Sequence, residues 1–170
     1  DEDIWVAFFI AAVLRTVVVV HHLFTANSIA HIWGLRPYNA SIGPTESKLT
    51  MYLSMGEGSH NYHHTFPMDY AASEKLFWES FNPSALFIDI CSMVGLAQDL
   101  KKPSPEVVKG VVSRKGDPAF YEHKLLHRKS MSRRILKGLK EWSMGIFVAG
   151  WAIYPPIVFK VLTGRPLIVF

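Results

Sequence analysis

The stretch that decides the fold is residues 4–20, IWVAFFIAAVLRTVVVV, in which every residue except Arg15 and Thr16 is apolar. Its valine run, residues 17–20, is by itself typical of a buried strand. Strands rarely exceed about ten residues, so the full length predicts a helix. With residues 21–30 added, the segment is long enough to cross a bilayer. A charge is costly at mid-bilayer, so we expect Arg15 to pair, to reach the interface or to face other helices.

The charge of the chain is distributed unevenly around this helix. Only three of the 18 lysines and arginines fall in the apolar ends, and the other fifteen lie between Arg36 and Lys140. A basic middle next to an apolar helix is typical of a cytosolic segment at a membrane surface. No nucleic-acid-binding motif accompanies the charge, so we do not expect nucleic acid as a partner.

The predicted fold class is an all-α membrane protein, with a transmembrane helix followed by a helical cytosolic cap. Glycines and prolines predict a loop over residues 33–47. Thr45 is the expected N-cap of a helix over residues 46–64, which Pro67 would end. Gly56 and Gly58 interrupt this helix and lower its intrinsic helicity. Further helices are expected over residues 73–79, 83–100 and 106–115.

We divide the chain into four segments: the membrane helix (1–31), the cap (32–118), a basic amphipathic linker (119–141) and an apolar C-terminal segment (142–170). Residues 121–140 fit either a helix on anionic lipid or a solvated linker. Residues 142–162 are long enough to form an extra membrane helix, but Pro155 and Pro156 would kink it, so a re-entrant or interfacial segment is the alternative.

The chemistry of the chain centres on His60, His63 and His64. Residues three and four apart share one face of a helix, so the three imidazoles can converge on one point. Imidazole nitrogen binds iron, zinc, copper and nickel. The spacing therefore predicts a metal site rather than a merely polar helix face, and it leaves the choice of metal open.

Asn27 and His31 form a second candidate site at the end of the first helix. A polar pair emerging from a membrane helix is a functional candidate, and a histidine that reaches the interface is the alternative. Glu57 lies three residues before His60 and could accept the second N–H of a ligating imidazole. Asp69 could orient a histidine, cap a turn or pair with a lysine.

Four other histidines are expected to have no ligand role. His21 and His22 are adjacent, so they point in different directions on a helix and suit structural or interfacial positions. His123 and His127 lie among lysines and arginines, which favours a charged surface.

At this point the residues resemble the membrane acyl-CoA desaturases of the stearoyl-CoA (delta-9) type. Residues 27–31, NSIAH, followed by WG at 33–34 and RPY at 36–38, are similar to one motif of that family. Residues 56–58 (GEG), 60–64 (HNYHH), 66–67 (FP) and 69–70 (DY) are similar to its third histidine box. The resemblance runs from about Arg15 to Asp117.

The resemblance implies an oxidoreductase of the endoplasmic reticulum membrane, multi-pass, with its catalytic part in the cytosol. Such an enzyme uses O2 and two iron ions to place a cis double bond in a long-chain acyl-CoA, here at the delta-9 position. Electrons would come from NADH through cytochrome b5 reductase and cytochrome b5. By the same resemblance, His31, His60, His63 and His64 would be iron ligands, and Asn27 would hold iron through a water. No catalytic residue beyond these ligands is implied.

Two departures from the family qualify this expectation. The family has two earlier histidine boxes, one of the form His-x-x-x-x-His and one of the form His-x-x-His-His. The first pattern does not occur in the sequence, and the second occurs once, at residues 60–64, where it corresponds to the third box. Four histidines and a water cannot fill two iron coordination spheres, so this stretch alone is predicted to be inactive. Phe24 stands where the family has tryptophan, which bears on the acyl chain that the substrate tunnel accepts. A hydroxylase on the same di-iron scaffold and a non-catalytic truncated membrane homologue are the alternatives.

Overall fold

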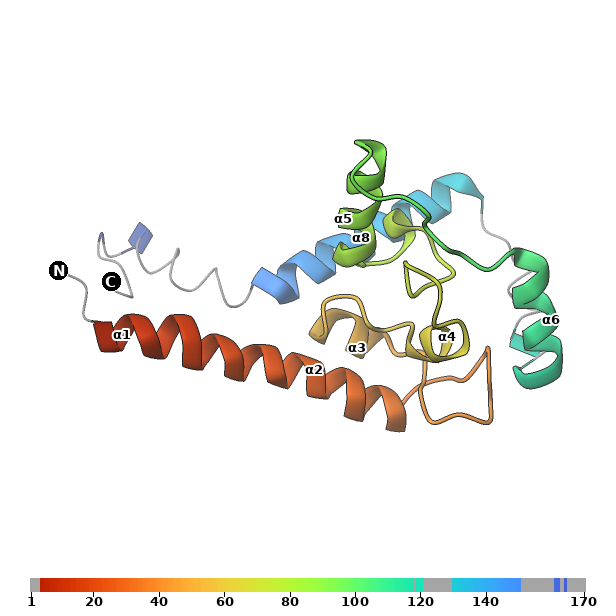
Figure 1. Ribbon diagram of the computed structural model, residues 1–170, viewed down its shortest axis with the longest axis horizontal. Helices are drawn as coiled ribbons and strands as arrows, with labels where there is room; N and C mark the ends of the chain where they lie inside the picture. The colour runs from red at the N-terminus through yellow and green to blue at the C-terminus, as the bar shows by residue number, and fades with distance from the viewer. Residues whose placement is uncertain (1–3, 118, 121–129, 151–160, 163, 165–170) are drawn as a thin grey trace.

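The computed structural model describes residues 4–117, 119–120, 130–150, 161–162 and 164. All of the regular elements in this part of the chain are helices, and its β-structure consists of two isolated bridges, Leu35 to Glu46 and Glu46 to Ser59. The helical fold class is therefore confirmed for the described residues (Figure 1). The elements are α1 (Ile4–Phe8), η1 (Phe9–Leu14, a π-helix), α2 (Arg15–Ile32), α3 (Lys48–Leu53), α4 (His60–Thr65), η2 (Phe77–Glu79, a 3-10 helix), α5 (Pro83–Met93), α6 (Pro105–Lys115) and α8 (Met131–Ala149).

The first three elements form one long rod that projects from the rest of the protein (Figure 1). Its stretch Phe9–Ile32 is long and apolar enough to cross a membrane, and only 6% of its most apolar window is buried. Large apolar side chains such as Leu23 and Phe24 are 59% and 58% exposed. Apolar surface of this extent is unfavourable in water and matches a hydrocarbon environment. The rod is thus the candidate membrane span of the described chain.

The single helix predicted over residues 46–64 is wrong, because a turn over residues 54–59 divides it into α3 and α4. Gly56 has φ +121°, a conformation that L side chains rarely adopt. A Cβ on Gly58 would lie 2.3 Å from the Cβ of Met51, so glycine lets the chain fold back against α3. The predicted N-cap is also displaced by two residues, since the Ser47 side chain accepts the hydrogen bond from the Thr50 amide.

Two further helices are shorter than predicted. Of residues 73–79, only Phe77–Glu79 form a helical turn. The helix predicted over residues 83–100 ends at Met93, and Gly95 follows with φ +78°. The expected loop after α2 is present, and α6 lies where sequence analysis places it, with Ser104 as its N-cap.

The buried core joins α4 to α6. It consists of Tyr38, Tyr62, Phe66, Val108 and Val112, all of them at most 6% exposed. Tyr62 and Phe66 lie on or next to α4, so the helix that carries the histidines is packed on one side against apolar residues. This packing fixes the direction in which the other side of α4 faces.

α8 is a continuous helix that crosses the predicted boundary between residues 141 and 142. It lies against η2 and α3. The division into four segments otherwise stays a prediction. His123 and His127 lie outside the described residues, and so do residues 151–160 of the predicted apolar stretch 142–162.

Candidate metal centre

Three histidines from two helices meet at the end of α2. His31 comes from the last turn of α2, and His60 and His64 come from α4. One ring nitrogen of each lies within 4.8 Å of the others. The Nε2 atoms of His31 and His60 are 3.1 Å apart, and the ring centroids of His60 and His64 are 4.5 Å apart. The structure therefore brings His31 to two histidines that lie 29 or more positions further along the sequence.

This geometry suits a metal ion. At a metal–nitrogen distance of about 2.1 Å, neighbouring ligand nitrogens lie about 3.0 Å apart in an octahedral arrangement and about 3.4 Å apart in a tetrahedral one. The observed 3.1 Å between His31 and His60 falls between these values. The buried Nδ1 atom of His60 also has no hydrogen-bond partner among the described residues. A buried polar nitrogen without a partner is costly, and with a metal at Nε2 this Nδ1 would donate to an acceptor from outside the described residues.

Helical geometry explains why His63 lies beside this group rather than in it. Each helical residue turns the chain by about 100°, so residue i+4 is offset from residue i by about 40° and residue i+3 by about 60° in the opposite sense. The His63 ring is accordingly 6.2 Å from that of His60 and 5.5 Å from that of His64. Its Nδ1 atom is also buried without a partner among the described residues.

The end of α2 is held in place by the loop that follows it. Thr45 donates its backbone N–H and its hydroxyl to the carbonyl of Ala30, at 2.6 and 2.7 Å. The guanidinium of Arg36 donates to the carbonyl of Gly43 at 3.0 Å. A Cβ on Gly43 would lie 3.3 Å from Nδ1 of His31, so the loop passes close to the ring. These contacts fix the position of His31.

Glu46 and Asn61 hold α4 in place. The Glu46 carboxylate accepts the Tyr62 amide at 3.0 Å and takes the part of an N-cap, because the Ser59 side chain makes no such bond. Burial raises the pKa of Glu46 above its ordinary value despite this hydrogen bond.

Asn61, between the histidines, is fully buried and uses both ends of its amide. It accepts from the amides of Tyr38 and Asn39 and donates to the carbonyls of Asn39 and Pro44, all within 3.1 Å.

The surroundings of His60 and His64 favour their neutral forms. Burial, followed by the neighbouring His64, His31 and His63, lowers the pKa of His60 to about 4. Burial and the neighbouring His63 and His31 also lower the pKa of His64. At neutral pH both rings are therefore uncharged, and uncharged imidazole is the form that binds metal.

The other predicted site residues lie outside this cluster. Asn27 is exposed one turn before His31 and donates its amide to the carbonyl of Leu23 at 3.0 Å. Glu57 is exposed in the turn before α4. Asp69 is buried and accepts from the Tyr62 hydroxyl at 2.6 Å and from the Ala71 amide, so it supports the far side of α4. Phe24 is exposed on α2, as are His21 and His22.

Sequence reasoning missed Glu46, Thr45 and Asn61 as supports of the histidines. Asn61 lies within the histidine box itself. Its polar side chain, directed away from the ligands, was the available sign of a supporting role. Glu46 and Thr45 gave no local signal, because their partners lie 15 or 16 residues away.

The described chain thus combines one candidate membrane helix with a three-histidine cluster of metal-binding geometry. No model of a known protein family matches it. Among individual proteins, it is 45% identical over 121 residues to an acyl-CoA desaturase of Cyprinus carpio, covering 71% of this chain and 36% of the relative. It is 46% identical over 116 residues to an acyl-CoA delta-12 desaturase of Tribolium castaneum, covering 68% and 32%. It is 41% identical over 116 residues to stearoyl-CoA desaturase 5 of Homo sapiens, covering 68% and 34%.

Similarity of this density over two thirds of the chain establishes common ancestry. The chain is a homologue of the acyl-CoA desaturases. It spans about a third of the length of the curated relatives it matches.

Proposed function

We propose that this chain is part of an acyl-CoA desaturase, an oxidoreductase that inserts a cis double bond into a saturated long-chain acyl-CoA with O2. The observation that carries the proposal is the meeting of His31, His60 and His64 in a chain homologous to proteins of that name. The three histidines lie at the end of a candidate membrane helix, where an apolar substrate and a polar metal centre can meet.

The ligand set of the proposed centre consists of His31, His60, His63 and His64, with Asn27 holding a metal through a water. The proposed cofactor is a pair of iron ions, which supply the activation of O2 that breaking an unactivated C–H bond requires. The residues of this chain hold neutral imidazoles in place and exclude water from the buried face of His60. Further histidines, from outside this chain, would complete the centre, so the chain alone is expected to be inactive.

The proposed setting is the endoplasmic reticulum membrane, as a multi-pass protein with the cap in the cytosol. The basic residues after α2 support this orientation. NADH-dependent reductase and cytochrome b5 would supply electrons. Phe24, exposed on α2, would line the path of the acyl chain. The delta-9 position is the proposed one, and the name of the Tribolium castaneum relative makes delta-12 the competing position.

Two alternatives follow from the same residues. A hydroxylase on this scaffold would use the same histidines and would differ in its product. A non-catalytic truncated membrane homologue would retain the fold without turnover. Analysis of products and of bound iron separates both from a desaturase.

The test uses the full-length parent protein in microsomes supplied with stearoyl-CoA and NADH. The desaturase proposal predicts iron in the purified protein, formation of oleate, and loss of oleate and of iron in His60→Ala and in His63→Ala. A 9-hydroxy product would establish the hydroxylase instead. Iron-free protein without turnover would establish the non-catalytic alternative and refute the proposal.

A further inference from the structure

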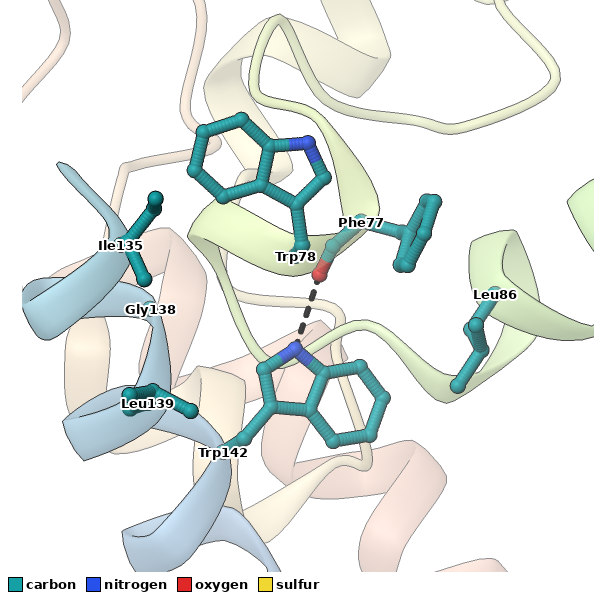
Figure 2. Close-up of a pocket in the computed structure, with 7 residues that line it drawn as sticks. All are labelled: Phe77, Trp78, Leu86, Ile135, Gly138, Leu139 and Trp142. Carbon is teal, nitrogen blue, oxygen red and sulfur yellow. Dashed lines mark hydrogen bonds between the residues drawn. The ribbon is translucent and has the colours of Figure 1, made fainter. Parts of the chain in front are cut away.

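The helix α8 is attached to the cap by one continuous face. Gly138 and Gly145 let it approach closely, since a Cβ would lie 2.0 Å from the Trp78 carbonyl oxygen at Gly138 and 2.2 Å from the Phe81 ring at Gly145. Between them, the Trp142 indole donates to the Phe77 carbonyl at 2.9 Å (Figure 2). Residues 138, 142 and 145 lie along one stripe of a helix, so a whole face of α8 is committed to η2 and its neighbours.

Polar contacts on the same face fix the position of α8 along its axis. Glu141, the only acidic residue of α8, is 5% exposed and pairs with Lys48 at 3.0 Å. It also accepts a hydrogen bond from the Tyr52 hydroxyl. Arg134 pairs with Glu79 at 2.7 Å. With one contact before the stripe, at Arg134, and one in its middle, at Glu141, α8 has a defined direction relative to the cap.

The outward face of α8 changes character along its length. Before Glu141 the exposed residues mix the basic Arg133 and Lys140 with large apolar side chains such as Leu136 and Leu139, which are 69% and 62% exposed. After Glu141 every exposed residue is uncharged, and the large ones are Met144, Ile146 and Phe147, at 43%, 54% and 55% exposure. A helix lying flat on a membrane separates charge from apolar surface around its axis. On α8 the exposed apolar residues continue along the whole helix, while the exposed charges are confined to its first half, which is the pattern of a helix that passes from the headgroup region into hydrocarbon.

The direction of α8 brings its apolar end toward the membrane side of the protein. Figure 1 shows α8 running back, opposite in direction to α2, toward the end at which α1 begins. α3 contacts both α2 and α8 and so connects them. The C-terminal half of α8 therefore points in the direction in which the rod projects. Its N-terminal half, which carries the exposed basic residues, lies beside the cap.

A shallow apolar hollow of about 300 Å³ lies at the base of α8, between Ile135, Leu139 and Trp142 on one side and Phe77, Trp78 and Leu86 on the other (Figure 2). Two indole rings border it, and tryptophan favours the interface between headgroups and hydrocarbon. The hollow thus lies at the level of residues 135–142, the last of α8 before the stretch that has no exposed charge.

We propose that the C-terminal half of α8 is inserted into the bilayer that α2 crosses, with Met144, Ile146 and Phe147 in hydrocarbon and Arg133 and Lys140 at anionic headgroups. The occupant of this exposed face is lipid rather than a second protein, because a half with both basic and apolar exposed residues is followed by a half without exposed charge, in the order of headgroup region and hydrocarbon. The inference rests on the proposed membrane setting of α2 and does not depend on desaturase activity.

The test places one fluorophore at a time on the full chain, in a background of Cys91→Ser, which removes the only cysteine. Phe147→Cys reports on the apolar end of α8 and Arg133→Cys on its basic end. Leu23→Cys is the reference in α2, and Lys109→Cys in α6 is the reference for water. Each labelled variant is reconstituted into phosphatidylcholine vesicles with and without phosphatidylserine, and brominated lipid and iodide serve as the quenchers.

We expect brominated lipid to quench the probe at residue 147 nearly as strongly as the probe at residue 23, and iodide to quench the probes at residues 133 and 109. At low salt, phosphatidylserine should increase the quenching of the probe at residue 147 by brominated lipid, because the anionic headgroups attract Arg133 and Lys140. Quenching by lipid at residue 23 but by iodide at residue 147 overturns the inference and leaves the membrane setting of α2 intact. Protection of residue 147 from both quenchers shows a protein partner and also overturns it. Quenching of both probes by iodide refutes the membrane setting itself.

Discussion

The Nε2 atoms of His31 and His60 lie 3.1 Å apart, although His31 belongs to the last turn of α2 and His60 is the first residue of α4. Glu46 connects the two helices. Its backbone forms one β-bridge to Leu35, just after α2, and another to Ser59, just before His60. The geometry of the cluster therefore depends on a short segment of main chain that carries none of the histidines.

Removal of one histidine from the cluster should abolish tight metal binding. We expect His64→Ala to weaken binding of Co2+, a spectroscopic probe for Fe2+, by more than about 100-fold, because loss of even an outer-sphere partner costs 10–100-fold. His64 is exposed, so the substitution should leave the helix content unchanged. Visible absorption and calorimetry on the full chain in detergent measure the effect.

The matched control is His22→Ala, an exposed histidine on α2 that lies outside the cluster. It should bind the metal as the unaltered chain does. Equal affinity of the His64→Ala and unaltered chains would show that the cluster is not a metal site.

Asn61 should prove essential to the fold around the histidines. Asn61→Ala leaves two buried amides and two carbonyls without their partner, and each such group costs about 1–3 kcal/mol. We expect the free energy of unfolding to fall by more than about 3 kcal/mol. Asn61→Asp retains the acceptor for Tyr38 and Asn39 but sets a carboxylate oxygen against two carbonyls, so it should also destabilise the chain. Urea denaturation followed by circular dichroism measures both.

Ser113→Ala on the exposed face of α6 is the control, and its unfolding should shift by no more than about 0.5 kcal/mol. If Asn61→Ala unfolds at the same urea concentration as this control, the hydrogen bonds of Asn61 do not hold α4 in place.

The sequence predicted the parts of this structure that depend on local spacing. The rod follows from a long apolar run, and the i, i+4 relation of His60 and His64 follows from helical geometry. The turn between α3 and α4 was missed because Gly56 and Gly58 are tolerated within a helix at a modest cost. Glu57 lies in this turn, three residues before His60, and its role as an outer-sphere acceptor stays a prediction.

The parts that depend on distant contacts could not be predicted in this way. Glu46 reaches α4 by way of a turn, and its carboxylate binds an amide 16 residues further along the chain. The docking of α8 depends on Gly138 and Gly145. A glycine in a helix does not by itself predict a close contact, and the contacts with Trp78 and Phe81 are visible only in the folded structure.

Close packing makes Gly138 a sensitive position in α8. A Cβ there would meet the backbone oxygen of Trp78 at 2.0 Å, and backbone cannot move aside as a flexible side chain can. We expect Gly138→Ala to cost about 1–3 kcal/mol, the usual range for overpacking. Thermal unfolding measures the loss.

Gly110→Ala in α6 is the matched control, because the nearest atom to its Cβ would be the end of the Arg114 side chain at 3.4 Å. It should stabilise the chain by about 0.5–1 kcal/mol, since alanine favours a helix interior over glycine. A Gly138→Ala chain as stable as the Gly110→Ala chain would show that α8 does not pack against Trp78 in solution.

The attachment of α8 should weaken in acid through Glu79. Burial by itself would raise the pKa of this carboxyl, but the hydrogen bond and charge of Arg134 outweigh burial and hold the pKa below its ordinary value of 4.5. A carboxyl whose pKa is lowered by folding stabilises the folded state above the unfolded pKa, and this contribution disappears as the pH falls through the folded pKa. The pair is partly exposed, so solvent screening keeps its contribution to the free energy of unfolding small. We therefore expect the melting temperature to decrease between about pH 5 and pH 3, and to decrease less in Glu79→Gln, which cannot ionise. Parallel pH profiles of the two chains would show that Arg134 and Glu79 do not pair in solution.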